Sequence, residues 1–270
     1  MAKERVNIVT AFYDIGRGSW EGNVNGQDIP GFIKRSNDEY FERFARLCKL
    51  DNPITVFTQR KFSERIRAIR NDIKVGIMED IFQPTLVEGI KDVQTNKTFL
   101  NLIDNPSLPE YWSPEYIIIN LLKGFFVNAM ISKMSPEYDT TAWIDFGYCR
   151  DNVEVPDTWE FDTNDLINVV SNGPIDVYNT PTILEIIKSN MVFLQGCHII
   201  APNNRWQDFY EDIFKAFLSL ISVGLVDDDQ TLLLMAYRNN PMKYRILEGD
   251  SSNWFKIFQM NGGADEESIH

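Results

Sequence analysis

Val6-Asn7-Ile8-Val9-Thr10-Ala11 is an apolar, β-branched run that predicts a buried strand, and a glycine-rich stretch from Gly16 to Gly31 follows it. Similar runs occur at residues 54–58 and 74–78, and the segments between them carry apolar residues at helical spacing. Strands that alternate with helices are typical of an α/β protein whose sheet is covered by helices. We therefore expect an α/β fold over the first 150 residues.

Two helices have clear start signals. Ser36-Asn37-Asp38-Glu39 has the form of a capping box, and Ser113-Pro114-Glu115 places a capping hydroxyl before a proline and an acid in the first turn. The mostly apolar run that continues to Met130 predicts one buried helix. The segment 81–109 is interrupted by prolines and predicts only helical patches.

The rest of the chain continues the alternation. Thr141-Ala142-Trp143-Ile144 predicts a central strand that ends at Asp145. The other predicted elements are strands within 159–161, 191–200 and 244–247, a long amphipathic helix from Trp206 that ends by Gly224, and a helix from Asp227 through Tyr237. We find no internal repeat or linker, so we expect one domain over residues 1–258 and a disordered polar tail over 259–270.

Composition and charge narrow the function. The chain has 270 residues, of which 44% are hydrophobic, 24% charged and 13% aromatic, as in an ordinary globular protein. Its 39 acidic and 26 basic residues give a net charge of −13, which repels nucleic acid and anionic lipid surfaces. No nucleic-acid partner is therefore expected. A small anionic ligand would need a local cluster of arginine, lysine, backbone N–H groups or a metal.

Several features favour the cytoplasm. Cys48, Cys149 and Cys197 are odd in number and widely spaced, which indicates neither a disulfide framework nor a zinc site. The first residues lack the apolar core of a signal peptide, and we expect no transmembrane helix because no apolar run approaches the ~20 residues that a span needs.

The glycine-rich stretch after the first strand is a candidate ligand site. Gly16-Arg17-Gly18 resembles the start of a dinucleotide fingerprint, but Gly22 falls one position late, so the fingerprint fails. Loops at the carboxyl end of a strand bind ligands in open α/β sheets, and Arg17 could bind a phosphate there. A solvated arginine on a surface loop explains the same residues equally well.

Asp145 is the most prominent acid. At the end of a central strand it could hold Mg²⁺ or Mn²⁺ against a diphosphate, whereas the structural alternative is an aspartate that caps the following turn. Lys123 and Arg150 could add positive charge nearby, although a lone lysine in an apolar helix more often extends its charged end to solvent.

Asp227, Asp228 and Asp229 could supply a general base, because adjacent carboxylates raise one another's pKa, or they could only cap a helix. His198 is a minor candidate for a base or ligand, since a histidine in an apolar strand is more often a hydrogen-bonded core residue. Walker, G-x-S-x-G and H-E-x-x-H sequences do not occur, which argues against most hydrolase and zinc-protease functions.

Several separated motifs occur together in this chain. They are residues 10–20 (TAFYDIGRGSW), residues 51–58 (DNPITVFT), Trp112-Ser113-Pro114-Glu115-Tyr116 with Lys123, residues 143–148 (WIDFGY), and Asp228-Asp229-Gln230. In this order they resemble the bacterial HtrL/YibB (WlaTC/HtrL-like) family from about residue 6 to residue 250. The resemblance implies a single-domain GT-A-like fold, with a mixed central sheet flanked by helices, and transfer of a sugar from a nucleoside-diphosphate sugar such as a UDP-sugar. The acceptor it implies is a lipopolysaccharide, capsule or related surface glycan.

The resemblance also implies a site. The residues it places at the nucleotide sugar are Thr10, Ala11, Phe12, Arg17, Lys123, Asp145, Tyr148 and Arg150, with Asp145 as the first acid of a D-x-D motif. Asp228 and Asp229 are the candidate catalytic bases if the reaction inverts. Trp20, Tyr148 and Trp206 are candidates to stack on a nucleobase or sugar, unless they belong to the core.

The chain departs from the D-x-D pattern, because Gly147 replaces the second acid. Two neighbouring carboxylates therefore cannot chelate Mn²⁺ or Mg²⁺, and either Asp145 holds the metal alone or Arg17, Lys123 and Arg150 neutralise the diphosphate without one. The alternative to an enzyme is a degenerate GT-A fold that binds a sugar nucleotide or glycan as a scaffold. A glycolipid acceptor would bring the protein to the inner face of the inner membrane as a peripheral protein, with no help from its net charge.

Overall fold

The computed structural model describes residues 3–174, 181–249 and 254–260, which form one α/β domain. The strands are β1 (Glu4–Phe12), β2 (Asn23–Val24), β3 (Gln27–Asp28), β4 (Ile54–Thr58), β5 (Lys74–Ile77), β6 (Thr140–Ile144), β7 (Glu160–Phe161), β8 (Ile167–Val170), β9 (His198–Pro202) and β10 (Tyr244–Leu247). Apart from the β2–β3 hairpin, they form a sheet in the order β10-β8-β9-β6-β1-β4-β5, and β7 pairs with β1. Only β7 and β9 run antiparallel to their neighbours in this described sheet, which is therefore mixed.

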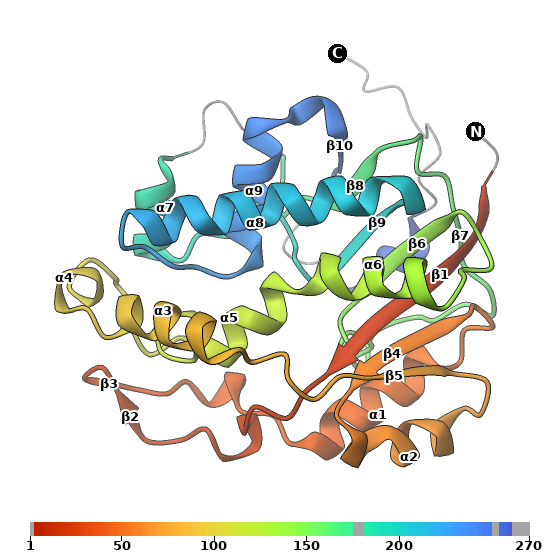
Figure 1. Ribbon diagram of the computed structural model, residues 1–270, viewed down its shortest axis with the longest axis horizontal. Coiled ribbons are helices and arrows are strands. Elements are labelled where there is room, and N and C mark those ends of the chain that lie inside the picture. Colours follow the sequence, from red (N-terminus) through yellow and green to blue (C-terminus); the bar gives the residue numbers. More distant parts are fainter. Residues whose placement is uncertain (1–2, 175–180, 250–253, 261–270) are drawn as a thin grey trace.

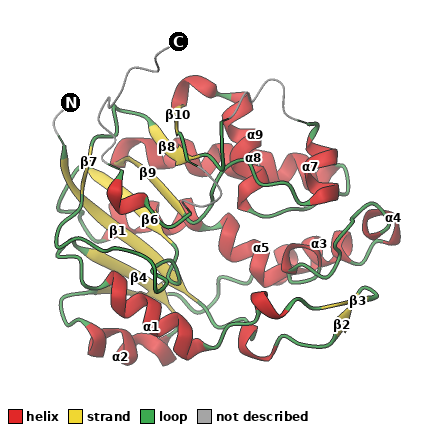
Figure 2. Cartoon of the chain, turned by 180° about the vertical axis from the view of Figure 1, so that it is seen from behind, coloured by secondary structure: helices red, strands yellow, loops and turns green. Residues whose placement is uncertain are grey.

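Helices cover both faces of the sheet (Figures 1 and 2). They are α1 (Asn37–Leu47), α2 (Arg60–Ile69), α3 (Pro84–Gln94), α4 (Lys97–Leu100), α5 (Pro114–Leu121), α6 (Lys123–Lys133), α7 (Ile183–Ser189), α8 (Trp206–Ser222) and α9 (Asp229–Asn239). Short 3-10 helices occupy Arg17–Ser19, Gly31–Ile33, Pro109–Tyr111, Asn203–Arg205, Pro241–Lys243 and Ile257–Gln259. In Figure 1, α6 and α8 lie across one face of the sheet, whereas α1 and α2 lie together at the β4–β5 side.

Two apolar cores result from this layering, one on each face. Successive residues of a strand point to opposite faces, and β1 shows this plainly: Val9 and Ala11 belong to the core beneath α6 and α8, whereas Ile8 and Phe12 belong to the core beneath α1 and α2. A strand buried on both faces is mostly apolar, which explains the run in the sequence, and the buried Asn7 side chain within it is hydrogen-bonded.

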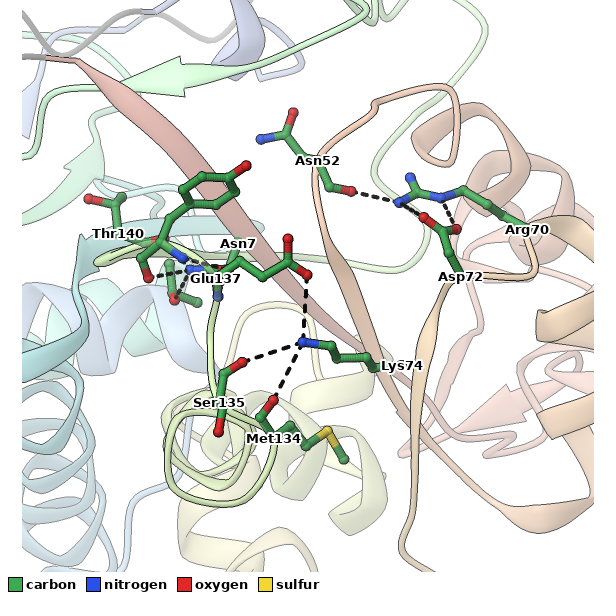
Figure 3. Close-up of polar contacts among 11 residues, drawn as sticks. Asn7, Asn52, Arg70, Asp72, Lys74, Met134, Ser135, Glu137 and Thr140 are labelled. Atoms are coloured by element: carbon green, nitrogen blue, oxygen red, sulfur yellow. Dashed lines mark hydrogen bonds and ion pairs between the residues drawn. The ribbon is translucent and has the colours of Figure 1, made fainter.

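Polar side chains join the strands and loops at the amino ends of the parallel strands (Figure 3). The buried Asn7 amide donates to the carbonyl oxygens of Tyr138 and Thr140 at 2.7 and 2.8 Å and accepts from the Glu137 backbone N–H at 2.9 Å. The Lys74 ammonium lies 3.4 Å from the carbonyl oxygens of both Met134 and Ser135. These contacts secure the loop between α6 and β6 at this edge of the sheet.

Most predicted elements are confirmed. The structure contains the predicted strand at residues 54–58, the Ser36 capping box and the last strand at 244–247. Gln259 belongs to a 3-10 helix and Met260 packs against the second core, so these two residues are not part of a disordered tail. The other residues of the predicted tail, 261–270, lie outside the described part of the chain.

Three predictions differ from the structure. The single helix predicted up to Met130 is two helices, because the backbone leaves helical geometry at Leu122 and turns by 44°. In the segment 191–200, a strand begins only at His198. Strand β8 and helix α7 fall in a stretch for which the sequence predicted no clear element, although Thr182 and Glu185 form a capping box at α7.

Among the described residues, no single helix is long and apolar enough to cross a membrane; α5 and α6 together meet the length and composition, across their bend.

Replacing Asn7 with alanine should destabilise the fold. The substitution leaves two buried carbonyl groups and the Glu137 N–H without their side-chain partner, which costs about 2–4 kcal/mol of unfolding free energy. Urea unfolding of Asn7→Ala and of the exposed control Asn23→Ala measures this loss. Equal free energies for the two variants would contradict it.

Candidate active site

A cavity of about 480 Å³ opens where the parallel strands end. The chain passes from β1 to β4 and β5 on one side, then returns to place β6 on the other side of β1. Open α/β sheets bind ligands at such a reversal, outside the carboxyl ends of the strands. The residues after β1 and β6 line the cavity, together with the segment before β9, the start of α9 and the 3-10 helix Pro109–Tyr111.

Lys123 forms the centre of the site. Its side chain is buried, and its ammonium nitrogen lies 2.6 Å from Asp229 Oδ2, 2.9 Å from Asp145 Oδ1 and 2.8 Å from the carbonyl oxygen of Gly196. Burial lowers the pKa of Lys123, but the two carboxylates outweigh burial and raise it above its ordinary value. The lysine is therefore a permanent cation that joins α6, β6, α9 and the loop before β9.

The bend between α5 and α6 positions this lysine. Because the helix breaks at Leu122, Lys123 is the first residue of α6 and faces the start of α9. Gly196 fits closely against the same group: a Cβ atom there would lie 2.0 Å from Asp229 Oδ2. Glycine at position 196 is thus required for the carboxylate to reach Lys123.

Asp228 and Glu110 form an acidic wall. Asp228 caps α9, with Oδ1 accepting from the Gln230 N–H at 3.1 Å, and its carboxyl group is partly exposed to the cavity. Burial, Asp229 and Asp227 raise the pKa of Asp228 well above its usual range. Burial and Asp228 raise the pKa of Glu110 to about 8. Both groups therefore keep their protons to a higher pH than free carboxyl groups do.

Asp227 lies behind this wall. It is buried, Oδ2 accepts a hydrogen bond from Thr231 Oγ1 at 2.7 Å, and burial and Glu110 raise its pKa to about 8. Asp227 is therefore a supporting residue for the cavity wall.

The positive charges of the cavity come from arginines, which we call the arginine wall. Arg17, Arg35 and Arg150 line the cavity, and Arg43 lies directly behind. Burial and the positive charges of Arg35 and Arg43 lower the pKa of Arg150 to about 10. Like charges held this close to one another form an anion-binding surface, because an anion relieves their repulsion.

Hydrogen bonds within the protein hold the Arg17 side chain in place. Its guanidinium donates to the carbonyl oxygen of Ile33 at 2.8 and 3.1 Å and to the Tyr40 hydroxyl at 2.7 Å, and it lies 5.7 Å from the ring centroid of Tyr116. Several of its N–H groups are therefore used within the protein, so Arg17 contributes positive charge more than free donors.

Most of the predicted site residues share this cavity. Those that line it are Ala11, Phe12, Arg17, Lys123, Asp145, Tyr148, Arg150, Asp228 and Asp229. Thr10 does not line the cavity. It lies within β1, and its side chain is fully buried. Lys123 is also not available to a diphosphate, since two carboxylates already neutralise it.

Other candidates lie outside the cavity or are buried in the core. Trp206 is fully buried beneath the sheet. Trp20 is half-buried and packs edge-on against Trp112, with ring centroids 4.7 Å apart. His198 is buried in β9, where burial lowers its pKa to about 4, so its imidazole is neutral. Tyr148 is almost fully buried as well, and its hydroxyl accepts from the Ile257 N–H at 3.1 Å.

The donor set does not fit a resident divalent cation. Asp145 Oδ1 already accepts hydrogen bonds from Lys123 and, at 2.7 Å, from Trp143 Nε1. No group of three or more His, Cys, Asp or Glu side chains in the described part of the chain is arranged to hold a metal ion. The ammonium of Lys123 lies between the carboxylates that would otherwise be the natural ligands.

Sequence reasoning missed Glu110, Arg35 and Arg43. Glu110 follows a proline in a stretch that looked like a broken helix, and Arg35 directly precedes the capping box of α1. Glu110 and Arg35 are charged residues that cap no helix and pair with no near neighbour in sequence. This property was the signal by which the sequence could have indicated a role in the site.

The fold and the site define an α/β protein with a mixed sheet and a charged ligand cavity at the carboxyl edge of its parallel strands. Residues 4–261 match the model of a family described as "Bacterial protein of unknown function (HtrL_YibB)". The chain belongs to this HtrL/YibB family. It is 30% identical over 266 residues to Protein HtrL of Escherichia coli (strain K12), with 95% of this chain and 92% of that protein covered.

One solved structure is similar over almost the whole length of the chain. Mouse xyloside xylosyltransferase 1, in a crystal structure of its apo form, matches with a TM-score of 0.41 and 11% identity, over 96% of this chain and 94% of that one.

The raised pKa of Glu110 predicts how stability changes with pH. Between its ordinary value of 4.5 and about 8, the folded protein keeps a proton that the unfolded chain has lost, so folding becomes less favourable as the pH rises. Relative to Glu110→Gln, the wild type should lose about 2–4 kcal/mol of unfolding free energy from about pH 5 to pH 8. Chemical denaturation across this range tests the expectation.

The exposed Glu88→Gln serves as the control, and it should keep a constant difference from the wild type. A constant difference for Glu110→Gln as well would show that Glu110 does not hold its proton.

Proposed function

We propose that this protein is a glycosyltransferase that takes its sugar from a nucleoside-diphosphate sugar bound in the cavity. One observation carries the proposal: the same cavity is lined by arginines and by Asp228, whose partly exposed carboxyl group has a raised pKa. The arginines suit a diphosphate, and the carboxyl group suits an acceptor hydroxyl. A volume of about 480 Å³ lies within the range of ligand pockets.

The topology supports a GT-A-like placement of the donor. The cavity lies at the carboxyl ends of β1 and β6, the part of an open α/β sheet where nucleotides bind. The arginine wall stands beside the loops after both strands, so a diphosphate there would have its leaving oxygen near positive charge. Such fixed charges stabilise a leaving group as negative charge develops on it.

Asp228 is the residue in position to act as the base. In the proposed step, the acceptor hydroxyl loses its proton to Asp228 and its oxygen forms a bond to the anomeric carbon. The bond from that carbon to the diphosphate breaks, and the nucleoside diphosphate leaves with the electron pair. Asp229 cannot perform this role while its carboxylate is bonded to Lys123, although it helps to fix the start of α9.

A UDP-sugar donor and a lipopolysaccharide, capsule or related surface-glycan acceptor are the finer form of this proposal. A glycolipid acceptor would place the protein in the cytoplasm at the inner face of the inner membrane. These assignments rest on the family resemblance and on the charge division of the cavity.

A sugar-nucleotide binder without turnover is the second candidate. It is favoured by the fact that Lys123 pairs with both Asp145 and Asp229, so of these two carboxylates only that of Asp145, with its side chain 38% exposed, is open to a substrate. The binder and the enzyme share the arginine wall and differ in whether Asp228 accepts a proton during a reaction.

A uridine diphosphate ligand should raise the melting temperature. A ligand present at 100 times its Kd adds about 2.7 kcal/mol to the folded state, which corresponds to roughly 5 °C for a chain of this size. Uridine without phosphates should give a much smaller shift, because it leaves the arginines unpaired. Absence of a shift with any nucleoside diphosphate would refute both the enzyme and the binder.

Asp228→Asn should lower the rate of sugar transfer or sugar-nucleotide hydrolysis by about 10²–10⁴, since it removes the base. The rate of the wild type should rise with pH, because the pKa of Asp228 is raised and only the ionised carboxylate accepts a proton. The exposed Asp92→Asn is the matched control. Equal, measurable rates in all three proteins would remove Asp228 from catalysis. No turnover in any of them, with the nucleotide still bound, would favour the binder.

A further inference from the structure

We infer that this protein binds the phosphates of its ligand without a divalent cation, on Arg35 and Arg150 with Arg43 behind them, because the ammonium of Lys123 occupies the space between the carboxylates that would hold a metal. The inference rests on the proposed function and specifies how its anionic ligand is neutralised.

The first argument concerns Lys123. Three oxygens surround its ammonium at 2.6–2.9 Å, and two of them belong to carboxylates on different elements, Asp145 after β6 and Asp229 in α9. An ammonium has three N–H donors, so this arrangement satisfies all of them. A divalent cation could bind both carboxylates only by displacing a buried lysine, which would then be left as an unpaired charge.

The second argument concerns the arginines. Among the described residues, no carboxylate forms an ion pair with Arg35 or Arg150, and Arg43 has only a contact of 4.0 Å with Glu39. Arg150 Nε and Arg43 Nη1 are buried and have no hydrogen-bond partner. Buried N–H donors in proteins nearly always have a hydrogen-bond acceptor. An arginine at a cavity whose donor lacks an acceptor, as Arg150 does, therefore indicates that a ligand supplies it.

The third argument concerns how the arginines are held. The Arg150 guanidinium lies over the ring of Phe255, 4.5 Å from its centroid, and the pKa of Arg150 is lowered by burial and by Arg35 and Arg43. A fold that keeps mutually repelling guanidinium groups partly buried without a carboxylate partner has preformed a site for an anion. Guanidinium groups match the planar pairs of oxygens of a phosphate better than a lysine does.

Two binding measurements on the full-length chain test the inference. Isothermal titration calorimetry of uridine diphosphate should give the same Kd, within about twofold, in EDTA and in Mn²⁺. Binding that is more than about tenfold tighter in Mn²⁺ would overturn the inference and leave the proposed function standing. Absence of binding in both conditions would overturn the proposed function itself.

Inorganic pyrophosphate separates the phosphate site from the nucleoside. Arg35→Gln and Arg150→Gln should each weaken pyrophosphate binding by about tenfold, the effect of losing one charge-assisted contact. The exposed Arg67→Gln, which removes a surface ion pair with Glu64, should bind as the wild type does. Unchanged binding in both cavity variants would overturn the assignment of the arginines.

Lys123→Ala tests the occupied position directly. Removing the ammonium leaves Asp145 and Asp229 free to bind a cation, so the variant should take up Mn²⁺, measured as loss of the free-ion signal in electron paramagnetic resonance, whereas the wild type should not. A wild type that binds Mn²⁺ equally well would overturn the inference, and so would a folded variant that gains no binding. If the variant does not fold, the measurement on the wild type still decides.

Discussion

The ion bridge at Lys123 is the interaction on which the rest of the site depends. A lysine buried at the start of α6 must be paired, because an isolated ammonium in the protein interior is strongly unfavourable. Its two carboxylate partners come from β6 and α9, which are separated by more than eighty residues in the chain, and the third acceptor is a backbone carbonyl before β9. The bridge thereby fixes the relative positions of the elements that carry Asp145, Gly196 and Asp228. Buried ion pairs of this kind contribute more to a specific arrangement than to net stability.

The two walls of the cavity explain how a chain with a net charge of −13 can accept an anion. Long-range repulsion from surface carboxylates is screened over about 10 Å at ordinary salt, whereas partly buried charges inside a cavity are screened much less. The arginines therefore dominate the potential around them, and the raised pKa values of Glu110 and Asp228 reduce the negative charge of the acidic wall. Binding of an anion and the protonation of this acidic wall favour each other, because each lowers the electrostatic cost of the other.

Local chemistry in the sequence predicts much of the fold but only part of the site. The alternation of β-branched runs and capping signals located β1, α1, β4 and β10, since these depend on neighbouring residues alone. The break between α5 and α6 was not predictable, because no proline stands at or directly before Leu122 and the contacts of these helices with α8 and α9 involve residues distant in sequence. Asp145 and Arg17 were found because they follow strands. Glu110 and Arg35 were missed because their importance depends on residues distant in sequence.

The carboxyl-terminal segment also forms part of the cavity. Phe255 lines it and supports Arg150, and the backbone of Ile257 holds the Tyr148 hydroxyl, while Ile257 and Phe258 fill the core beneath the sheet. For anyone preparing this protein, a fragment trimmed before residue 254 would lack one side of its own binding pocket.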